Sequence, residues 1–281
     1  MNDIPRLNPH EFSHHKARKR FGQNFLHDQN IVRRIVAAVV PQKNQLILEI
    51  GPGQGAITRL LLQAEPRLTA LELDRDLVAG LRQVFANQPN LTLIEGDALT
   101  FSLSRIADIS ESTSIGRVRV VGNLPYNIST PLLFHLLNQR DHVMDMHFML
   151  QKELVTRLAA TAGSKDYGRL SVIAQYHCHV IDLFDVPPTA FFPQPKVTSA
   201  IVRLQPRVPE LAAQDIHTLS RVVSTAFQQR RKTLRNTLKP LFTEAQIIDA
   251  EISPDARAET LSVVDFVRLT NLLYTTTNGA Q

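Results

Sequence analysis

Cysteine is almost absent from the sequence: Cys178 is the one cysteine among 281 residues. A chain with a single cysteine forms no intramolecular disulfide, and it has no pair of closely spaced cysteines for a zinc site. Such scarcity fits a reducing compartment such as the cytoplasm. His177 and His179 flank the cysteine, but too few further ligand residues lie nearby in the sequence, so we expect no metal site.

Long apolar runs are also missing. The N-terminus lacks the apolar stretch of a signal peptide, and no segment approaches the length of a membrane span. The most apolar early run, residues 31–40, is interrupted by Arg33 and Arg34. Apolar residues nevertheless make up 43% of the chain, enough for a hydrophobic core. We expect a soluble, cytoplasmic and monomeric protein with one large and one small domain.

Positive charge is in excess, with a formal net charge of +5 and a pI of about 9.6. It gathers in two clusters, one at residues 14–20 and one at residues 230–239. Either cluster could be an ordinary solvated charge run, but together they favour a polyanionic partner such as RNA. The candidate RNA-binding residues are Lys16, Arg18, Lys19, Arg20, Arg230, Arg231, Lys232 and Arg235.

From residue 28 to 150 the pattern alternates between helix-like and strand-like segments. Helical apolar spacing over residues 31–39 precedes the nearly all-apolar run 45–50, which is typical of a strand buried on both faces of a parallel sheet. Further strands are predicted at 68–73, 91–95, 117–121 and 144–151. This alternation predicts an α/β fold with a doubly wound, mostly parallel sheet.

After residue 165 the pattern changes. Residues 170–180 and 197–204 indicate two longer strands, which we expect as an antiparallel pair at the sheet edge. Pro206 and Pro209 mark a linker, and helical spacing follows it. The predicted divisions are a basic N-terminal extension at 1–20, an α/β domain at 21–207 and a small all-helical domain at 208–281.

Four residues that close predicted strands recur at even intervals. Gly51, Glu72, Asp97 and Asn123 are separated by 21, 25 and 26 residues, about one strand–helix unit each. Because the carboxyl ends of parallel strands lie at one edge of the sheet, we expect these four positions to converge on a single crevice.

The glycine-rich turn at residues 51–55 follows the first of these strands and precedes a helix. Glycines let the backbone approach a ligand closely, and the helix N-terminus adds positive potential. Gly51, Gly53 and Ala56 also satisfy the dinucleotide pattern, with Glu72 at the right distance to hold a ribose. The turn alone therefore leaves open a nicotinamide or flavin enzyme, and also a tight turn without a ligand.

Later residues favour an amino-group methyltransferase. Asp97 can accept a hydrogen bond from the amino group of a bound adenine, which suits a cofactor made of adenosine and methionine. Asn123-Leu-Pro-Tyr126 follows the next strand end. The side-chain carbonyl of Asn123 and the backbone carbonyl of Leu124 can hold the two N–H bonds of an adenine amine, so that the nitrogen lone pair points at the methyl group. Tyr126 offers a face on which a flipped base can stack.

These features belong to a longer series of stretches that resembles the ribosomal RNA adenine N6,N6-dimethyltransferases, in the order of that family and most closely its bacterial KsgA type. The stretches are Gly22-Gln-Asn-Phe-Leu26, Glu49-Ile-Gly-Pro-Gly-Gln-Gly-Ala56, Glu72-Leu-Asp74, Gly96-Asp-Ala-Leu99, Gly122-Asn-Leu-Pro-Tyr-Asn-Ile-Ser129, Met149-Leu-Gln-Lys-Glu153, Phe191-Phe-Pro-Gln-Pro-Lys-Val-Thr-Ser199 and Arg230-Arg-Lys-Thr-Leu-Arg-Asn236. The resemblance implies a Rossmann-like domain that binds S-adenosyl-L-methionine and a helical domain that docks RNA. It further implies dimethylation of two adjacent adenines in a hairpin loop near the 3′ end of 16S ribosomal RNA, in the small ribosomal subunit during its biogenesis.

The resemblance also assigns roles to residues. The cofactor-binding residues it implies are Asn24, Leu26, Gly51, Gly53, Glu72, Asp97 and Asn123. The residues it implies for catalysis are Asn123, Leu124 and Tyr126, with Phe191 stacking on the other face of the target base. Three alternatives stay open at this point: a large-subunit enzyme of the antibiotic-resistance type, a ribosome assembly factor with dispensable catalysis, and a nicotinamide oxidoreductase.

Overall fold

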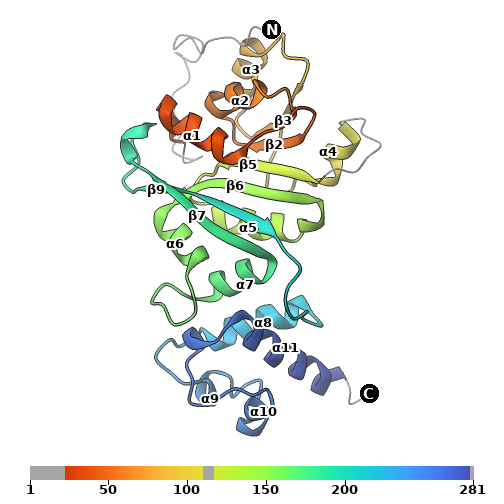
Figure 1. Ribbon diagram of the computed structural model, residues 1–281, viewed down its shortest axis with the longest axis vertical. Helices are drawn as coiled ribbons and strands as arrows, with labels where there is room; N and C mark the ends of the chain where they lie inside the picture. The colour runs from red at the N-terminus through yellow and green to blue at the C-terminus, as the bar shows by residue number, and fades with distance from the viewer. Residues whose placement is uncertain (1–22, 110–116, 279–281) are drawn as a thin grey trace. The chain divides into compact units, whose positions relative to one another are not determined.

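The computed structural model describes residues 23–109 and 117–278, and these form two compact units (Figure 1). The first unit comprises the described residues up to Val155 together with Ile181–Pro206. The second comprises Thr156–Val180 and the described residues from Arg207 onward. The N-terminal basic cluster, with Lys16, Arg18, Lys19 and Arg20, lies outside the described residues.

A seven-stranded sheet forms the centre of the first unit, in the order β4-β3-β2-β5-β6-β9-β7. The strands are β2 (Leu46–Ile50), β3 (Arg67–Glu72), β4 (Leu91–Glu95), β5 (Val118–Asn123), β6 (Val143–Gln151), β7 (Cys178–Val186) and β9 (Ser199–Pro206). Strands β2 to β6 pair in parallel, and β9 pairs antiparallel with β6. The predicted doubly wound sheet with antiparallel strands toward one edge is therefore confirmed.

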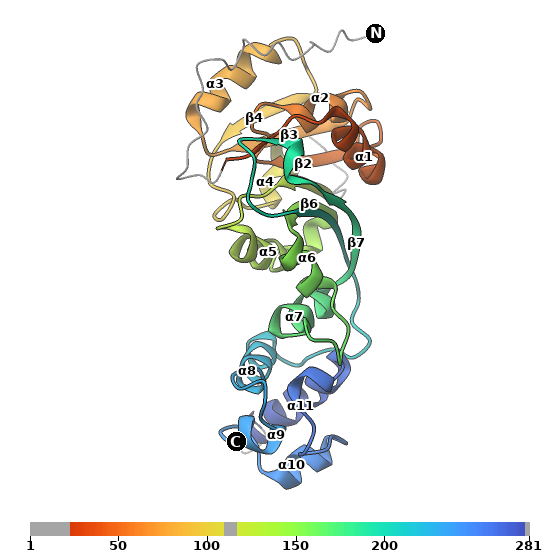
Figure 2. The ribbon, with the colours of Figure 1, turned by 90° about the vertical axis from the view of Figure 1, so that its left-hand side faces the viewer.

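Helices cover both faces of this sheet. They are α1 (Gln29–Val39), α2 (Ala56–Leu62), α3 (Arg75–Val84), α4 (Ser104–Ile109), α5 (Ser129–Leu137) and α6 (Lys152–Ala159). Apolar side chains of α1, α2 and α3 share one core cluster with sheet residues such as Ile47 and Leu68. Figure 2 shows α5 on the other side of β6 from α1, as the crossovers of a doubly wound sheet require.

Helix α1 illustrates how the local sequence sets these boundaries. The Asp28 carboxylate caps the helix by accepting from the backbone N–H of Asn30 at 2.8 Å. Every third or fourth residue then turns inward, and the buried ones are Ile31, Val32, Ile35 and Val39. The helix ends where Val40 adopts a left-handed conformation, with φ of 50°.

The second unit is largely helical. It contains α7 (Arg169–His177), α8 (Ile216–Ala226), α9 (Leu234–Thr237), α10 (Glu244–Asp249) and α11 (Val263–Asn278). Helix α11 packs on α7 and α8. Between these helices the Phe227 ring lies 5.7 Å from that of Phe266 and 6.2 Å from that of Tyr167. Among the helices of the described ranges, none combines the length and the apolar character needed to cross a membrane.

Two predictions about this region are wrong. Residues 170–180 are not one strand, because Arg169–His177 form helix α7 and a strand starts at Cys178. Helix α7 is buried nearly all round, and a continuous apolar run does not distinguish a buried helix from a buried strand.

The helical pattern expected for residues 208–281 would place the basic cluster at 230–239 on a helix, but Arg230, Arg231 and Lys232 lie in a turn that precedes the four-residue α9. The backbone N–H of Leu234 donates to the carbonyl of Ala256 at 2.8 Å, and a continuous helix would use that donor internally.

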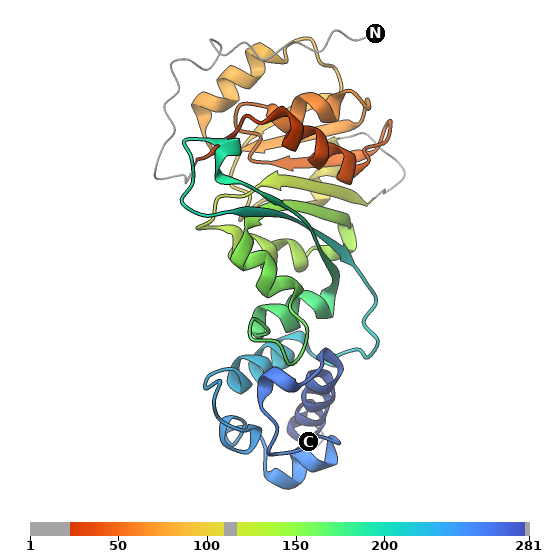
Figure 3. The same cartoon turned by 60° about the vertical axis from the view of Figure 1, so that its left-hand side comes forward.

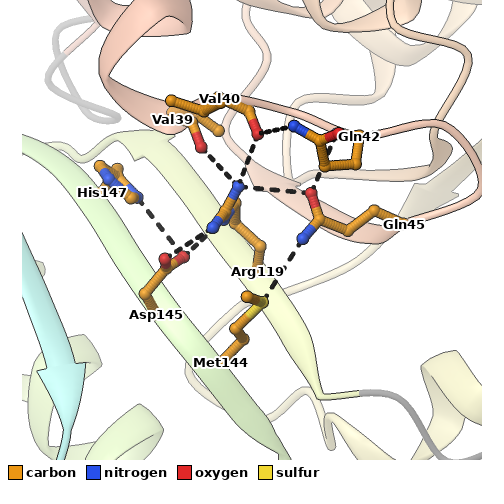
Figure 4. Close-up of polar contacts among 8 residues, drawn as sticks. All are labelled: Val39, Val40, Gln42, Gln45, Arg119, Met144, Asp145 and His147. Carbon is orange, nitrogen blue, oxygen red and sulfur yellow. Dashed lines mark hydrogen bonds and ion pairs between the residues drawn. The ribbon is translucent and has the colours of Figure 1, made fainter.

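A buried polar network joins α1 to the two central strands (Figure 4). The Arg119 guanidinium on β5 donates two hydrogen bonds to the Asp145 carboxylate on β6, at 2.7 and 2.8 Å. It also donates to the carbonyls of Val39 and Val40, which end α1 without intrahelical partners. One cation thus satisfies a buried carboxylate and a helix C-terminus together.

We predict that Arg119→Met lowers the free energy of unfolding by about 3–5 kcal/mol, because it leaves the Asp145 carboxylate buried without its cation. The double variant Arg119→Met/Asp145→Leu removes both charges and should recover part of this loss. Urea unfolding followed by circular dichroism measures both values. A double variant less stable than the single variant would contradict this assignment.

Candidate active site

The four strand ends that the sequence spacing picked out line one cavity of about 240 Å³ in the first unit. Gly51 follows β2, Glu72 ends β3, Asp97 comes two residues after β4, and Asn123 ends β5. Parallel pairing brings these carboxyl ends to one edge of the sheet, and the cavity lies at that edge. The predicted convergence is confirmed.

The glycine turn forms one wall of the cavity. Gly51, Gly53 and Gly55 have backbone φ angles of 66°, 58° and 79°, which residues with a side chain rarely adopt. A Cβ on Gly51 would lie 3.6 Å from the backbone carbonyl oxygen of Asn123, so a larger side chain there would fill the gap between the turn and the end of β5. The turn is therefore a cradle that glycine keeps open for a ligand.

Glu72 links the end of β3 to this turn. Its carboxylate accepts from the backbone N–H of Gly53 at 3.1 Å and from that of Asp74 at 3.0 Å. Burial raises the pKa of Glu72, while these backbone donors oppose the rise. A carboxylate fixed in this way suits the hydroxyl groups of a ribose.

Asp97 borders the cavity from the strand next to β3. One of its carboxylate oxygens accepts from the backbone N–H of Leu99 at 2.9 Å, which orients the side chain. The remaining acceptor capacity of this partly buried carboxylate fits a donor such as the exocyclic amine of adenine.

A segment that we call the strap, Gln23–Leu26, spans the cavity edge from the end of β3 to the end of β5. The Gln23 amide donates to the Asp74 carboxylate at 3.0 Å, and the Asn123 amide donates to the Asn24 backbone carbonyl at 3.0 Å. Residues Phe25–Leu26 (β1) also pair antiparallel with Phe191–Phe192 (β8), and Figure 3 shows the teal segment that carries β8 beside the red start of the described chain. The structure thus brings Asn24 and Leu26 to the cavity.

The Asn123-Leu-Pro-Tyr126 stretch forms another wall of the cavity, beside the glycine turn. The backbone N–H of Leu124 donates to the carbonyl of Met149 at 3.2 Å, and the Pro125 carbonyl accepts from the Ser129 hydroxyl at 2.9 Å. The Tyr126 hydroxyl lies 2.9 Å from Ser199 Oγ. These contacts fix the backbone of the stretch and the outer end of the tyrosine ring.

The bond between Asn123 and Asn24 defines which way the Asn123 amide points. A backbone carbonyl only accepts, so the atom facing it must be the amide nitrogen. The side-chain oxygen of Asn123 therefore remains as an acceptor. This oxygen can accept a hydrogen bond from an N–H group of an amine substrate.

Phe191 is the predicted site residue that the structure does not bring to the cavity. Its side chain is 3% exposed and packs in the hydrophobic core with Leu26, outside the set of lining residues. Its stacking role stays a prediction, and the position of the side chain speaks against it.

Two of the predicted RNA-binding arginines form ion pairs within the second unit. Arg230 pairs with Glu259 at 3.4 Å, and Arg235 pairs with Asp255 at 2.7 Å. Within the described chain, the exposed Arg231 and Lys232 have no such pairing. The described residues also contain no group of three or more His, Cys, Asp or Glu side chains that could hold a metal ion.

Sequence reasoning missed several residues of the site, notably Glu49 and Gln23 in the cavity lining and Asp74, which accepts from Gln23. Glu49 is fully buried behind the glycine turn, where the Thr58 hydroxyl donates to its carboxylate at 2.6 Å. Burial raises the pKa of Glu49 from 4.5 to about 7, against the opposing hydrogen bond from Thr58. Each of these residues belongs to a stretch that resembles the family, but neither the strand-end spacing nor the resemblance assigned a role to it.

Comparisons with known proteins find a matching family and similar proteins. The family model for ribosomal RNA adenine dimethylases matches residues 14–275. The ribosomal RNA small subunit methyltransferase A of Pseudomonas aeruginosa is 54% identical, covering 94% of this chain and 97% of its own length. The protein of that name from Nitrosococcus oceani is 55% identical, covering 91% of this chain and 96% of its own length.

Solved structures support the fold. A dimethyladenosine transferase from Plasmodium falciparum has a TM-score of 0.76 at 24% identity and covers 91% of this chain and 98% of that one. The 23S rRNA methyltransferase ErmE has a TM-score of 0.67 at 25% identity and covers 89% of this chain and 100% of that one. The first of these likenesses concerns the fold alone.

The raised pKa of Glu49 predicts how stability depends on pH. Between pH 4.5 and about 7 the unfolded chain releases this proton while the folded protein keeps it, so Glu49 lowers the free energy of unfolding as the pH rises. This decrease in the free energy of unfolding is complete above about pH 7 and amounts to about 3 kcal/mol at most. Glu49→Gln, which keeps an acceptor for Thr58, should therefore gain stability relative to the unchanged protein between pH 5 and pH 8. Urea unfolding at both pH values tests this, and parallel pH profiles would refute it.

Proposed function

Because the chain belongs to the ribosomal RNA adenine dimethylase family, we propose that it dimethylates N6 of two adjacent adenines in a hairpin loop near the 3′ end of 16S ribosomal RNA. It is an S-adenosyl-L-methionine-dependent methyltransferase. The observation that carries the proposal is that Asn123-Leu-Pro-Tyr126 lines the same cavity as the glycine turn, Glu72 and Asp97. An amine acceptor site and a nucleoside site thereby lie side by side.

The residues of the cavity fit the cofactor. Gly51 and Gly53 would let the backbone approach it, Glu72 would hold the ribose hydroxyls and Asp97 would bind the adenine amine. Asn24 and Leu26 of the strap would cover its methionine end. S-adenosylmethionine, when bound, supplies a methyl group activated by a positively charged sulfur.

Asn123 and Leu124 would orient the target amine. The Asn123 side-chain oxygen and the Leu124 backbone carbonyl each accept one N–H of the adenine amine, which turns the nitrogen lone pair toward the methyl group. Transfer of the activated methyl group to a nitrogen held in this way would need no general base of the protein, because the nitrogen would lose its proton only afterward. Most of the rate then comes from positioning. Tyr126 would stack on the flipped base.

The curated relatives favour the small ribosomal subunit as substrate. Relatives named for the small subunit reach 54–55% identity, whereas the large-subunit methyltransferase ErmE is 25% identical. We propose that the substrate is the small subunit late in its assembly. Bacterial ribosomes lie in the cytoplasm, so this substrate implies that the protein works there, and we expect it to act as a monomer.

We further propose that residues 208–281 dock the RNA and that the basic extension at 1–20 adds contacts to it. The exposure of Arg231 and Lys232 supports the first part, because unpaired surface cations attract phosphates. Lys16, Arg18, Lys19 and Arg20 keep their predicted RNA-binding role on the strength of their charge alone.

The proposed substrate is tested by nucleoside mass spectrometry. Small subunits and large subunits that lack adenine methylation are incubated separately with the protein and S-adenosylmethionine. We expect N6,N6-dimethyladenosine in the small subunits and not in the large ones. Methylation of large subunits alone would reverse the choice of substrate.

We predict that Asn123→Ala lowers the rate of methyl transfer by at least about 100-fold, because the amine loses an acceptor that holds it in line with the methyl group. Calorimetry should find the affinity for S-adenosylmethionine lowered by no more than about 10-fold, since Gly51, Glu72 and Asp97 are untouched and only the hydrogen bond to the Asn24 carbonyl is lost. Equal losses of binding and transfer would contradict the assigned role. Gly51→Val, which fills the cradle, serves as the control that loses both.

A further inference from the structure

Phe192 is an aromatic residue whose side chain lies mostly in solvent. It is 74% exposed, and it is the only phenylalanine among the exposed large apolar residues of the described chain. Its neighbour Phe191 is 3% exposed. The two-residue strand β8 therefore sends one ring into the core and the other into solvent, as the alternation of a strand requires.

The pairing of β8 places Phe192 at the edge of the active-site cavity. Phe192 lies opposite Phe25 in the antiparallel pair, and residues directly opposite each other have their side chains on the same face with Cβ atoms about 5 Å apart. Phe25 lines the cavity, and its ring lies 3.2 Å from the position of a Cβ on Gly53. Phe192 itself is not a lining residue, so its ring stands beside the cavity rather than inside it.

The segment after Phe192 contacts the wall of the same cavity that contains Tyr126. It ends at Ser199, whose hydroxyl lies 2.9 Å from that of Tyr126. The carbonyl of Thr198 accepts from the backbone N–H of Lys152 at 2.9 Å, which fixes the segment at β6. Between β8 and these anchors, Lys196 and Val197 are exposed. The exposed ring and a cation thus stand on one anchored segment that borders the cavity.

We propose that Phe192 stacks on the nucleobase next to the target adenine in single-stranded RNA, and that Lys196 contacts a neighbouring phosphate. This inference rests on the proposed function. A base that enters the cavity leaves its chain neighbours at the mouth, where the exposed ring of Phe192 offers a face to any base. Stacking would hold the strand in register while the target base is flipped, without touching the reacting atoms.

The test measures steady-state methylation of small ribosomal subunits by Phe192→Ala, Phe192→Trp and Phe192→Leu. Val40→Ala, at a residue of the first unit that is 58% exposed, is the matched control for loss of an exposed apolar side chain. We expect Phe192→Ala to raise KM for the subunits about 10-fold, with kcat and the calorimetric Kd for S-adenosylhomocysteine changed less than 2-fold. Phe192→Trp should stay within 2-fold of the unchanged protein, and Phe192→Leu should resemble the alanine variant.

Lys196→Gln separates the two contacts. It should reduce the slope of log affinity against log salt concentration by about 1, whereas Phe192→Ala should leave this slope unchanged. An unchanged KM for Phe192→Ala would overturn the proposal. So would a leucine variant that behaves as the unchanged protein, since that points to an apolar contact with a protein partner. In both cases the unchanged protein still methylates the subunits; if it does not, the proposed function itself fails.

Discussion

The Asn123 side chain serves two partners because its two ends differ chemically. Its amide nitrogen donates to the backbone carbonyl of Asn24, so its oxygen is left to accept from another donor. The same bond holds the strap against the end of β5. In the proposed function, the strap that covers the cofactor and the side chain that accepts the amine are therefore held by one hydrogen bond, and a shift of either segment would disturb the other. The remaining contacts of the site serve to keep these two segments in place.

Strand β5 carries that constraint into the body of the first unit. Asn123 ends this strand, and Arg119 lies four residues earlier within it. The Arg119 network ties β5 to β6 and to the end of α1, the helix that follows the strap in the chain. A buried ion pair of this kind contributes little net stability compared with apolar packing, but it is costly to break and it specifies one arrangement of the strand and helix it joins. The active-site edge is thus anchored from inside the sheet.

Much of the site followed from the sequence because parallel sheets obey a simple rule. Even spacing of Gly51, Glu72, Asp97 and Asn123 was enough to predict their convergence, since every strand end lies at one edge. Helix α7 was missed because a segment buried on all sides has no periodic pattern to read. The contacts of the strap could not be predicted from the sequence either, because Gln23 and Asp74 are 51 residues apart and meet only in the folded chain.

The two phenylalanines of β8 show a second limit. The resemblance chose Phe191, but which of two adjacent residues in a strand faces the core depends on register with a partner strand, here β1. The sequence alone contains no signal for that register. The turn at Arg230–Lys232 is a similar case, because the backbone N–H of Leu234, just after it, donates to the carbonyl of Ala256, which lies 22 positions away in the sequence.

A crystal structure with S-adenosylhomocysteine and adenosine bound would show directly how the Asn123 amide is oriented. The account predicts that the nitrogen of Asn123 still donates to the Asn24 carbonyl, and that its oxygen and the Leu124 carbonyl lie about 2.7–3.2 Å from N6 of the adenosine. An Asn123 oxygen turned away from N6, or an adenosine amine beyond hydrogen-bond reach of both acceptors, would contradict it.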